Sequence, residues 1–102
     1  MANKMPEIKV ALEPTDVRVV HKYPLPMDNC SLWLAKGSII LDISEQYGEL
    51  FMWVERPSDD VVCEVHTFEV FGTGFPIPPK ARKFLKTVHH SSGLVLHYYE
   101  VV

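Results

Sequence analysis

The sequence predicts a mainly β protein, built as a single small antiparallel sheet of six to seven strands that curls into a half-open barrel or a sandwich. Three observations support this fold class. Most of the chain consists of short segments in which β-branched and aromatic residues alternate with polar ones, as in half-buried strands. Eight prolines, which interrupt helices and central strands, mostly fall between these segments. The longest segment runs into a Gly-Thr-Gly sequence, where glycine allows the chain to reverse.

The composition indicates one domain. The chain has 102 residues and is 47% hydrophobic, which is enough for one core and not two. We expect residues 1–15 to form a weakly ordered lead-in or edge strand, and residues 16–102 to form a single β-rich domain.

A net charge of −3 argues against general nucleic-acid binding. No apolar run approaches the roughly 18 residues of a membrane span, and no secretory signal opens the chain, so we expect a cytoplasmic protein without membrane association.

The two cysteines, Cys30 and Cys63, match neither a zinc-binding spacing nor a redox Cys-x-x-Cys motif. In a reducing cytoplasm we expect two free thiols, and a disulfide only if the protein is exported.

Two strands are predicted near the start of the domain. The first covers residues 17–23 and is followed by Pro24 and Pro26, so it lies at a sheet edge or ends there. The second covers residues 31–35, and Lys36-Gly37 predicts the turn that follows it.

The clearest predicted hairpin joins residues 38–44 to residues 50–55 through a four-residue connection at 45–48. Its first strand places three apolar side chains on one face: Ile39, Leu41 and Ile43. Both faces of its second strand are apolar, so we expect that strand to be central or covered on both sides.

The longest predicted strand covers residues 61–71. Its apolar residues change parity along the way, because Val65 and Phe68 belong to opposite faces of a regular strand. We therefore expect a β-bulge or bend near His66 that restores a consistent inward face.

We expect at most one short helix, near residues 79–84. The residues at helical spacing in this region are Ala81, Phe84, Leu85 and Val88. We favour a brief helical turn after Pro79, followed by a last hairpin of residues 84–88 and 94–102 around the turn at 89–93.

The Gly-Thr-Gly sequence is interpreted as a strand-ending structural turn, because a phosphate-binding loop needs more glycine, a lysine and a following helix. The residues of this turn are Gly72, Thr73, Gly74 and Pro76. A basic segment follows it, with Lys80, Arg82, Lys83 and Lys86. If the turn and the basic segment meet in space, they form a site for an anion such as a nucleotide; otherwise the segment is a solvated face.

Histidine is the only residue type that offers a set of metal ligands, at His66, His89, His90 and His97. Adjacent histidines of a strand point in opposite directions, so we expect no metal and no cofactor. His97 and Glu100 have opposite parity, which disfavours an acid–base pair and favours a structural, hydrogen-bonded His97. With no nucleophile in an elbow-like turn beside a histidine, we expect the protein not to be an enzyme.

The aromatic residues are too many for one small core, so some are expected at the surface or between subunits. We predict that Trp33 and Phe75 contribute to binding, together with the four cations of the basic segment. A homodimer seam is the alternative use of such a surface.

The order and spacing of several motifs resemble a family of small uncharacterised proteins of tailed bacteriophages. The resemblance covers roughly residues 17–101. The matching residues are Lys22, Tyr23, Pro24, Leu25, Trp53, Gly72, Thr73, Gly74, Pro76, Ile77, His97, Tyr99 and Glu100. Phe75 and Lys36-Gly37-Ser38 depart from the pattern. The resemblance implies a viral origin and expression inside a bacterium, but no known activity and no functional residues.

Together these observations favour a non-enzymatic phage protein that binds a host protein in the bacterial cytoplasm, for host takeover or counter-defence. One alternative is a homo-oligomeric protein that sequesters an anionic small molecule, such as a signalling nucleotide. The other is a minor component of the virion.

Overall fold

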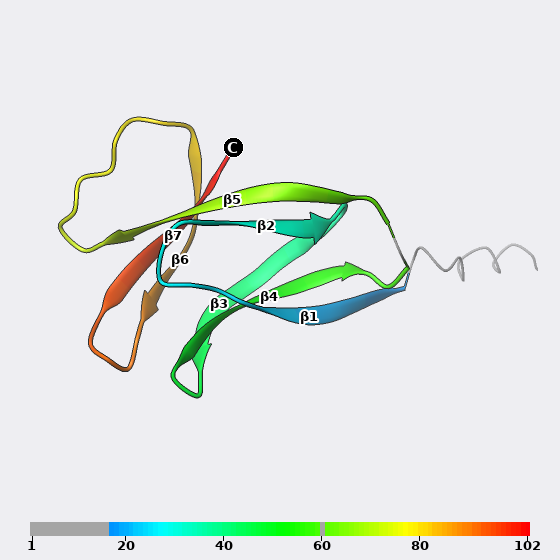
Figure 1. Ribbon diagram of the computed structural model, residues 1–102, viewed down its shortest axis with the longest axis horizontal. Helices are drawn as coiled ribbons and strands as arrows, with labels where there is room; N and C mark the ends of the chain where they lie inside the picture. The colour runs from blue at the N-terminus through cyan, green and yellow to red at the C-terminus, as the bar shows by residue number, and fades with distance from the viewer. Residues whose placement is uncertain (1–16, 60) are drawn as a thin grey trace, which may run out of the picture.

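The computed structural model describes residues 17–59 and 61–102, and the described residues form an all-β fold (Figure 1). The seven strands of this part are β1 (Arg18–Pro24), β2 (Cys30–Ala35), β3 (Ile39–Gln46), β4 (Glu49–Pro57), β5 (Cys63–Gly72), β6 (Arg82–His89) and β7 (Val95–Val101). The lead-in predicted for residues 1–15 lies outside the described residues.

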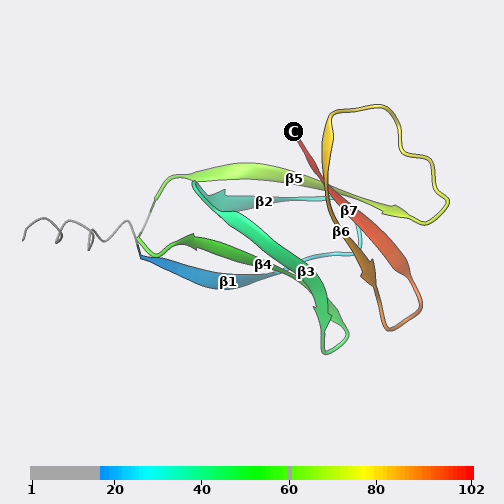
Figure 2. The ribbon, with the colours of Figure 1, turned by 180° about the vertical axis from the view of Figure 1, so that it is seen from behind.

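The strands form two antiparallel sheets, one ordered β1-β4-β3 and the other β2-β5-β7-β6. In Figures 1 and 2 the two sheets are stacked, with β1 and β4 in one layer and β2 and β5 in the other. The predicted fold class is thus confirmed, in its sandwich form. The predicted edge position of the first strand and the central position of residues 50–55 are also confirmed.

Residues 79–84 contain no helix. Residues 79–81 lead as irregular chain into β6, which already begins at Arg82. The helical turn favoured after Pro79 is therefore wrong, and the spacing of three between Leu85 and Val88 has another cause, described below.

The core lies between the two sheets and is formed by the inward-facing residues of both. Its buried apolar residues are Leu25, Leu34, Ile43, Leu50, Met52, Val54, Phe68, Val88, Leu96 and Tyr98. The Tyr98 ring is completely buried, and its hydroxyl donates a 3.0 Å hydrogen bond to the carbonyl oxygen of Pro26. Burial raises the pKa of Tyr98 to about 12.

The β3–β4 hairpin has a shorter loop than the four residues predicted. Gln46 pairs with Glu49, which leaves only Tyr47 and Gly48 in the turn. Their φ angles are 55° and 82°, and positive φ at both central residues defines a type I′ turn. The twist of this turn matches the twist of the two strands, which is why the strands pair to their ends.

Two β-bulges interrupt the edge strands that face each other across the sandwich. In β3 the pairing shifts between Ile40 and Asp42, so Leu41 is the extra residue. In β6 it shifts between Phe84 and Lys86, so Leu85 is extra. A bulge moves later side chains to the other face. Ile43 is therefore buried while Leu41 is exposed, contrary to the shared face predicted for them.

The bulge predicted near His66 is absent, because β5 keeps one register along its pairing with β2 and with β7. In this register Phe68 faces the core, and Val65 lies on the opposite, outer side of the same strand. The change of parity in the sequence thus reflects apolar residues on both faces of a regular strand.

Candidate functional site

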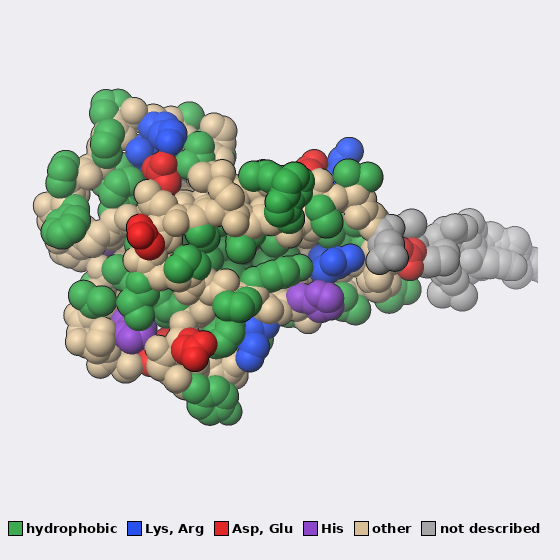
Figure 3. Space-filling model, in the orientation of Figure 1, with side chains coloured by type: hydrophobic (Ala, Val, Ile, Leu, Met, Phe, Trp, Pro, Cys, Tyr) green, Lys and Arg blue, Asp and Glu red, His purple; other side chains and the backbone are tan. Residues whose placement is uncertain are grey.

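The outer face of the four-stranded sheet carries an unusual number of apolar side chains. We use "outer face" for the surface formed by Trp33, Val65, Phe71, Phe84 and Tyr99, which lie on the side of the sheet opposite the buried Phe68 and Tyr98. In the space-filling view, hydrophobic side chains form a raised cluster over β2 and β5 (Figure 3).

At one end of the outer face, Trp33 of β2 lies directly opposite Val65 of β5. Trp33 is 69% exposed and Val65 is 50% exposed. In the other sheet, polar groups contact the aromatic side chains. The indole nitrogen of Trp53 donates a hydrogen bond to Ser44, and the Lys22 ammonium lies 4.4 Å from the Phe51 ring centroid. The Trp33 ring, by contrast, is largely exposed to solvent.

At the other end, three aromatic rings contact one another edge to face. The Tyr99 ring lies 5.8 Å from Phe71 and 5.4 Å from Phe84, measured between ring centroids. Such pairs add about 0.5–1.5 kcal/mol beyond the burial of their area. Phe84 is 53% exposed, so this cluster also presents apolar surface to solvent.

Between the two ends lies Glu69, which engages two cations of the basic segment. Lys80 donates to one carboxylate oxygen over 2.8 Å, and Arg82 donates to the other over 2.7 Å. These hydrogen bonds, from Lys80 first and Arg82 second, lower the pKa of Glu69. The Arg82 guanidinium also lies 5.2 Å from the Phe71 ring centroid. Both cations are therefore paired with one carboxylate within the sheet.

The other two cations of the basic segment lie elsewhere. Lys86 forms an ion pair with Asp42 of β3. Lys83 lies on the inner side of β6, opposite Glu100 of β7. The structure thus distributes the four cations over both sides of the sheet and does not gather them around the Gly-Thr-Gly turn.

The Gly-Thr-Gly turn ends β5 as a reverse turn. Phe75 donates its backbone N–H to the carbonyl of Gly72, and Gly74 has a φ of 88°, as the third residue of a type II turn requires. The Thr73 hydroxyl hydrogen-bonds Nε2 of His97 over 2.9 Å. Thr87 hydrogen-bonds the other ring nitrogen of His97 at the same distance. The turn thus follows the end of β5, and both ring nitrogens of His97 are hydrogen-bonded to threonine hydroxyls.

Phe75 lies beyond this turn and is 70% exposed. Its ring borders an apolar depression of about 550 Å³, which is also lined by Met27, Val70 and Leu94. This depression is at the end of the sandwich where β5 enters the following loop. Phe75 and Trp33 are therefore both exposed, but they are not neighbours on one strand pair.

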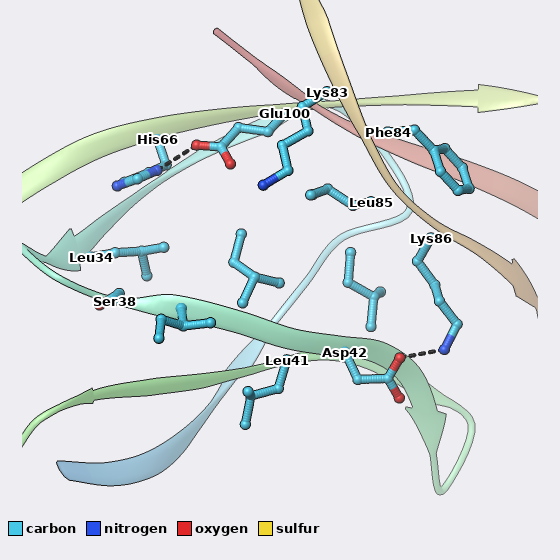
Figure 4. Close-up of a pocket in the computed structure, with 13 residues that line it drawn as sticks. Leu34, Ser38, Leu41, Asp42, His66, Lys83, Phe84, Leu85, Lys86 and Glu100 are labelled. Atoms are coloured by element: carbon cyan, nitrogen blue, oxygen red, sulfur yellow. Dashed lines mark hydrogen bonds and ion pairs between the residues drawn. The ribbon is translucent and has the colours of Figure 1, made fainter.

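A cleft of about 420 Å³ opens between the edge strands β3 and β6 (Figure 4). His66 and Glu100 form one wall, with His66 Nδ1 2.5 Å from a carboxylate oxygen of Glu100. The His66–Glu100 contact was not predicted from the sequence. It follows from strand parity if β5 is a regular strand, because both residues then lie on the inner face of neighbouring strands.

Within the described residues no group of three His, Cys, Asp or Glu side chains is arranged to hold a metal ion. Cys30 and Cys63 are both free thiols, and burial raises the pKa of Cys30. No helix in the part of the chain that the structure describes has the length and hydrophobicity needed to cross a membrane.

Comparison with known proteins places the fold unit within a family. Residues 17–102 match the family model of DUF7352, a domain of unknown function. The chain belongs to this family. No curated protein and no solved structure matches it. The DUF7352 domain thus coincides with the β sandwich, and its family description states neither an activity nor a source.

The residues behind the resemblance to phage proteins meet in pairs in the DUF7352 domain. Lys22 is the cross-strand partner of Trp53, and Thr73 hydrogen-bonds His97. The third pair joins Glu100 to His66, which lies outside the matching set. The sequence pattern therefore corresponds to contacts that hold strands and turns together.

Proposed function

We propose that this DUF7352 protein is a non-enzymatic bacteriophage protein that docks a host protein in the bacterial cytoplasm through its outer face. The viral and bacterial parts of the proposal rest on the sequence resemblance over roughly residues 17–101. The docking part rests on one observation: Trp33 is 69% exposed beside a 50% exposed Val65.

The outer face suits a protein partner better than a small molecule. Trp, Tyr and Arg are the residues in which interfaces concentrate their binding energy. The outer face offers the exposed Trp33 and the part-exposed Tyr99, whereas only 8% of the Arg82 side chain is exposed. Small-molecule sites are concave, and Trp33 and Val65 line neither the depression beside Phe75 nor the cleft between β3 and β6. The pairing of Lys80 and Arg82 with Glu69 also reduces the positive charge open to a polyanionic partner.

The test is affinity purification of the tagged protein from a bacterial host, followed by binding measurements with the purified partner. We expect Trp33→Ala to weaken binding by about 30-fold, which corresponds to the 2 kcal/mol of an interface hot spot. Tyr47→Asn is the matched control, because Tyr47 is 95% exposed on the β3–β4 turn, away from the outer face. A partner that binds both variants as tightly as the wild type would refute docking through this face.

The rival functions predict other outcomes. A protein that sequesters a signalling nucleotide would unfold at a higher temperature in the presence of that nucleotide, by mass action. A minor virion component would be detected by mass spectrometry of purified particles. Either result, together with failure to isolate a host protein, would replace the proposal.

A further inference from the structure

The cleft between β3 and β6 lies apart from the outer face and has the features of a preformed small-molecule site. Its volume of about 420 Å³ is within the range of about 300–1,000 Å³ found for ligand pockets. Most of its lining residues belong to β3 and β6, which lie side by side as edge strands of the two sheets (Figure 2). Leu34 of β2 contributes to its lining from behind the two edge strands.

The two edge strands are fixed relative to each other at one end of the cleft. Lys86 is ion-paired with Asp42, and the backbone N–H of Ser91 donates to a Glu45 carboxylate oxygen over 2.6 Å. His90 adds a 3.0 Å hydrogen bond from its ring to the carbonyl of Gly48. The bulges at Leu41 and Leu85 lie beside this bridged end. An ion pair and two hydrogen bonds therefore hold the two edges together at this end of the cleft.

Among the described residues, one ammonium group of the cleft lining forms no ion pair. Lys83 and Glu100 are direct cross-strand partners, yet the Glu100 carboxylate bonds to His66 and not to Lys83. Among the described residues no carboxylate lies within ion-pair distance of the Lys83 ammonium, whereas Lys80, Arg82 and Lys86 each have one. Figure 4 shows the Lys83 side chain directed into the cleft.

Apolar and polar groups share the rest of the lining. Ile40 and Leu85 are the part-buried apolar residues that the two edge strands contribute. They place hydrocarbon in the same cleft as Lys83, beside the carboxylates of Asp42 and Glu100. A complementary ligand therefore combines one anionic group with an apolar chain.

We propose that the cleft between β3 and β6 binds a small amphipathic monoanion. Its carboxylate or phosphate group contacts Nζ of Lys83, and its apolar chain packs against Ile40 and Leu85. Nucleotides with several phosphates are disfavoured, because Lys83 is the one cleft ammonium without an ion pair in the described part of the chain, and the carboxylates of Asp42 and Glu100 share the lining. A peptide strand is disfavoured as well, because a bulge on each edge strand breaks the ladder that strand addition needs.

The test is an NMR titration of the ¹⁵N-labelled protein with octanoate and, separately, with octyl phosphate. We expect amide shifts at residues 38–43, 83–86, His66 and Glu100, and the stronger of the two ligands identifies the preferred head group. Lys83→Met keeps the apolar stem and removes the charge, so it lowers the affinity about tenfold or more. Lys36→Met is the matched control, because Lys36 is an exposed cation on the β2–β3 turn outside the cleft; we expect its affinity to equal that of the wild type.

Four results would overturn the proposal. They are octylamine or octanol binding as tightly as octanoate, an affinity unchanged in Lys83→Met, no amide shifts with either anion, and shifts at this edge that depend on protein concentration without ligand. The last result would assign the cleft to contact between copies of the chain. Lys83 is exposed, so we expect Lys83→Met to fold as the wild type does. An NMR spectrum of the variant that matches the wild type outside the cleft shows that a loss of binding is not due to unfolding.

Discussion

Asp42 of β3 and Lys86 of β6 form an ion pair that joins the edge strands of two different sheets. Each residue lies directly after the extra residue of a bulge, Leu41 in β3 and Leu85 in β6. The bulges thus bring a carboxylate and an ammonium together where regular strands would have placed other side chains. This contact closes one end of the sandwich edge and leaves the cleft open at the other.

The first prediction concerns the strength of this ion pair. Both side chains are more than one third exposed, so water and salt screen the attraction. We expect Asp42→Asn to lower the free energy of unfolding by about 0.2–1 kcal/mol at low salt, and by less at high salt. Urea denaturation at two ionic strengths measures both values. Glu49→Gln is the control, and a salt-independent loss for Asp42→Asn would contradict the prediction.

The second prediction concerns Glu69 in acid. Its pKa is lowered in the folded protein by hydrogen bonds from Lys80 and then Arg82. A lowered folded pKa stabilises the fold above the unfolded value of about 4.3, and this contribution is lost as the pH falls through the folded pKa. We expect Glu69→Gln to be less stable than the wild type at neutral pH and the difference to shrink in acid. Denaturation midpoints across this range measure it, and a difference that grows in acid would refute the assignment.

The fold class followed from the sequence because alternation, prolines and turn glycines all indicated short antiparallel strands. The bulges could not be predicted from the sequence, because apolar residues three apart in a bulged strand have the spacing of a helix. Leu85 and Val88 both face the core across the bulge in β6, and Ile40 and Ile43 do the same in β3. A spacing of three read without the pairing partner cannot distinguish the two structures.

The candidate site was predictable only in part. Counting the aromatics against the size of one core predicted that some rings are exposed, but not which ones. The pairing of Trp33 with Val65 depends on a strand register that composition does not contain. The basic segment looked like a continuous patch, because sequence shows charges and not their partners. The carboxylates that pair with three of its cations, Glu69 and Asp42, come from other strands.

The third prediction concerns Tyr98 in alkali. Burial raises its folded pKa to about 12, above the unfolded value of about 10. The stabilisation is complete below about pH 10 and is lost as the pH rises towards 12, because the unfolded phenol ionises first. Tyr98→Phe removes the hydrogen bond to Pro26, at a cost of about 1 kcal/mol near neutral pH.

Urea midpoints of wild type and Tyr98→Phe, measured at neutral pH and above about pH 10, test this account. We expect the wild type to lose more stability than the variant over that interval, so the two values converge. Tyr47→Phe is the matched control, since Tyr47 is 95% exposed and makes no contact with the core. Equal alkaline losses in wild type and Tyr98→Phe would show that the buried phenol is not responsible.

The last prediction concerns the β3–β4 turn, where Tyr47 has a φ of 55° and is the only described residue other than glycine with a positive φ. Side chains other than Asn and Asp are strained in this region by about 1–2 kcal/mol. The ring is 95% exposed and contributes little packing, so Tyr47→Asn relieves the strain without losing contacts. We expect it to raise the free energy of unfolding by about 0.5–1 kcal/mol, and Gly48→Ala, at a φ of 82°, to lower it by about 1 kcal/mol. Thermal and urea denaturation measure both changes. A destabilised Tyr47→Asn would mean that the tyrosine ring stabilises the hairpin through a contact worth more than the backbone strain.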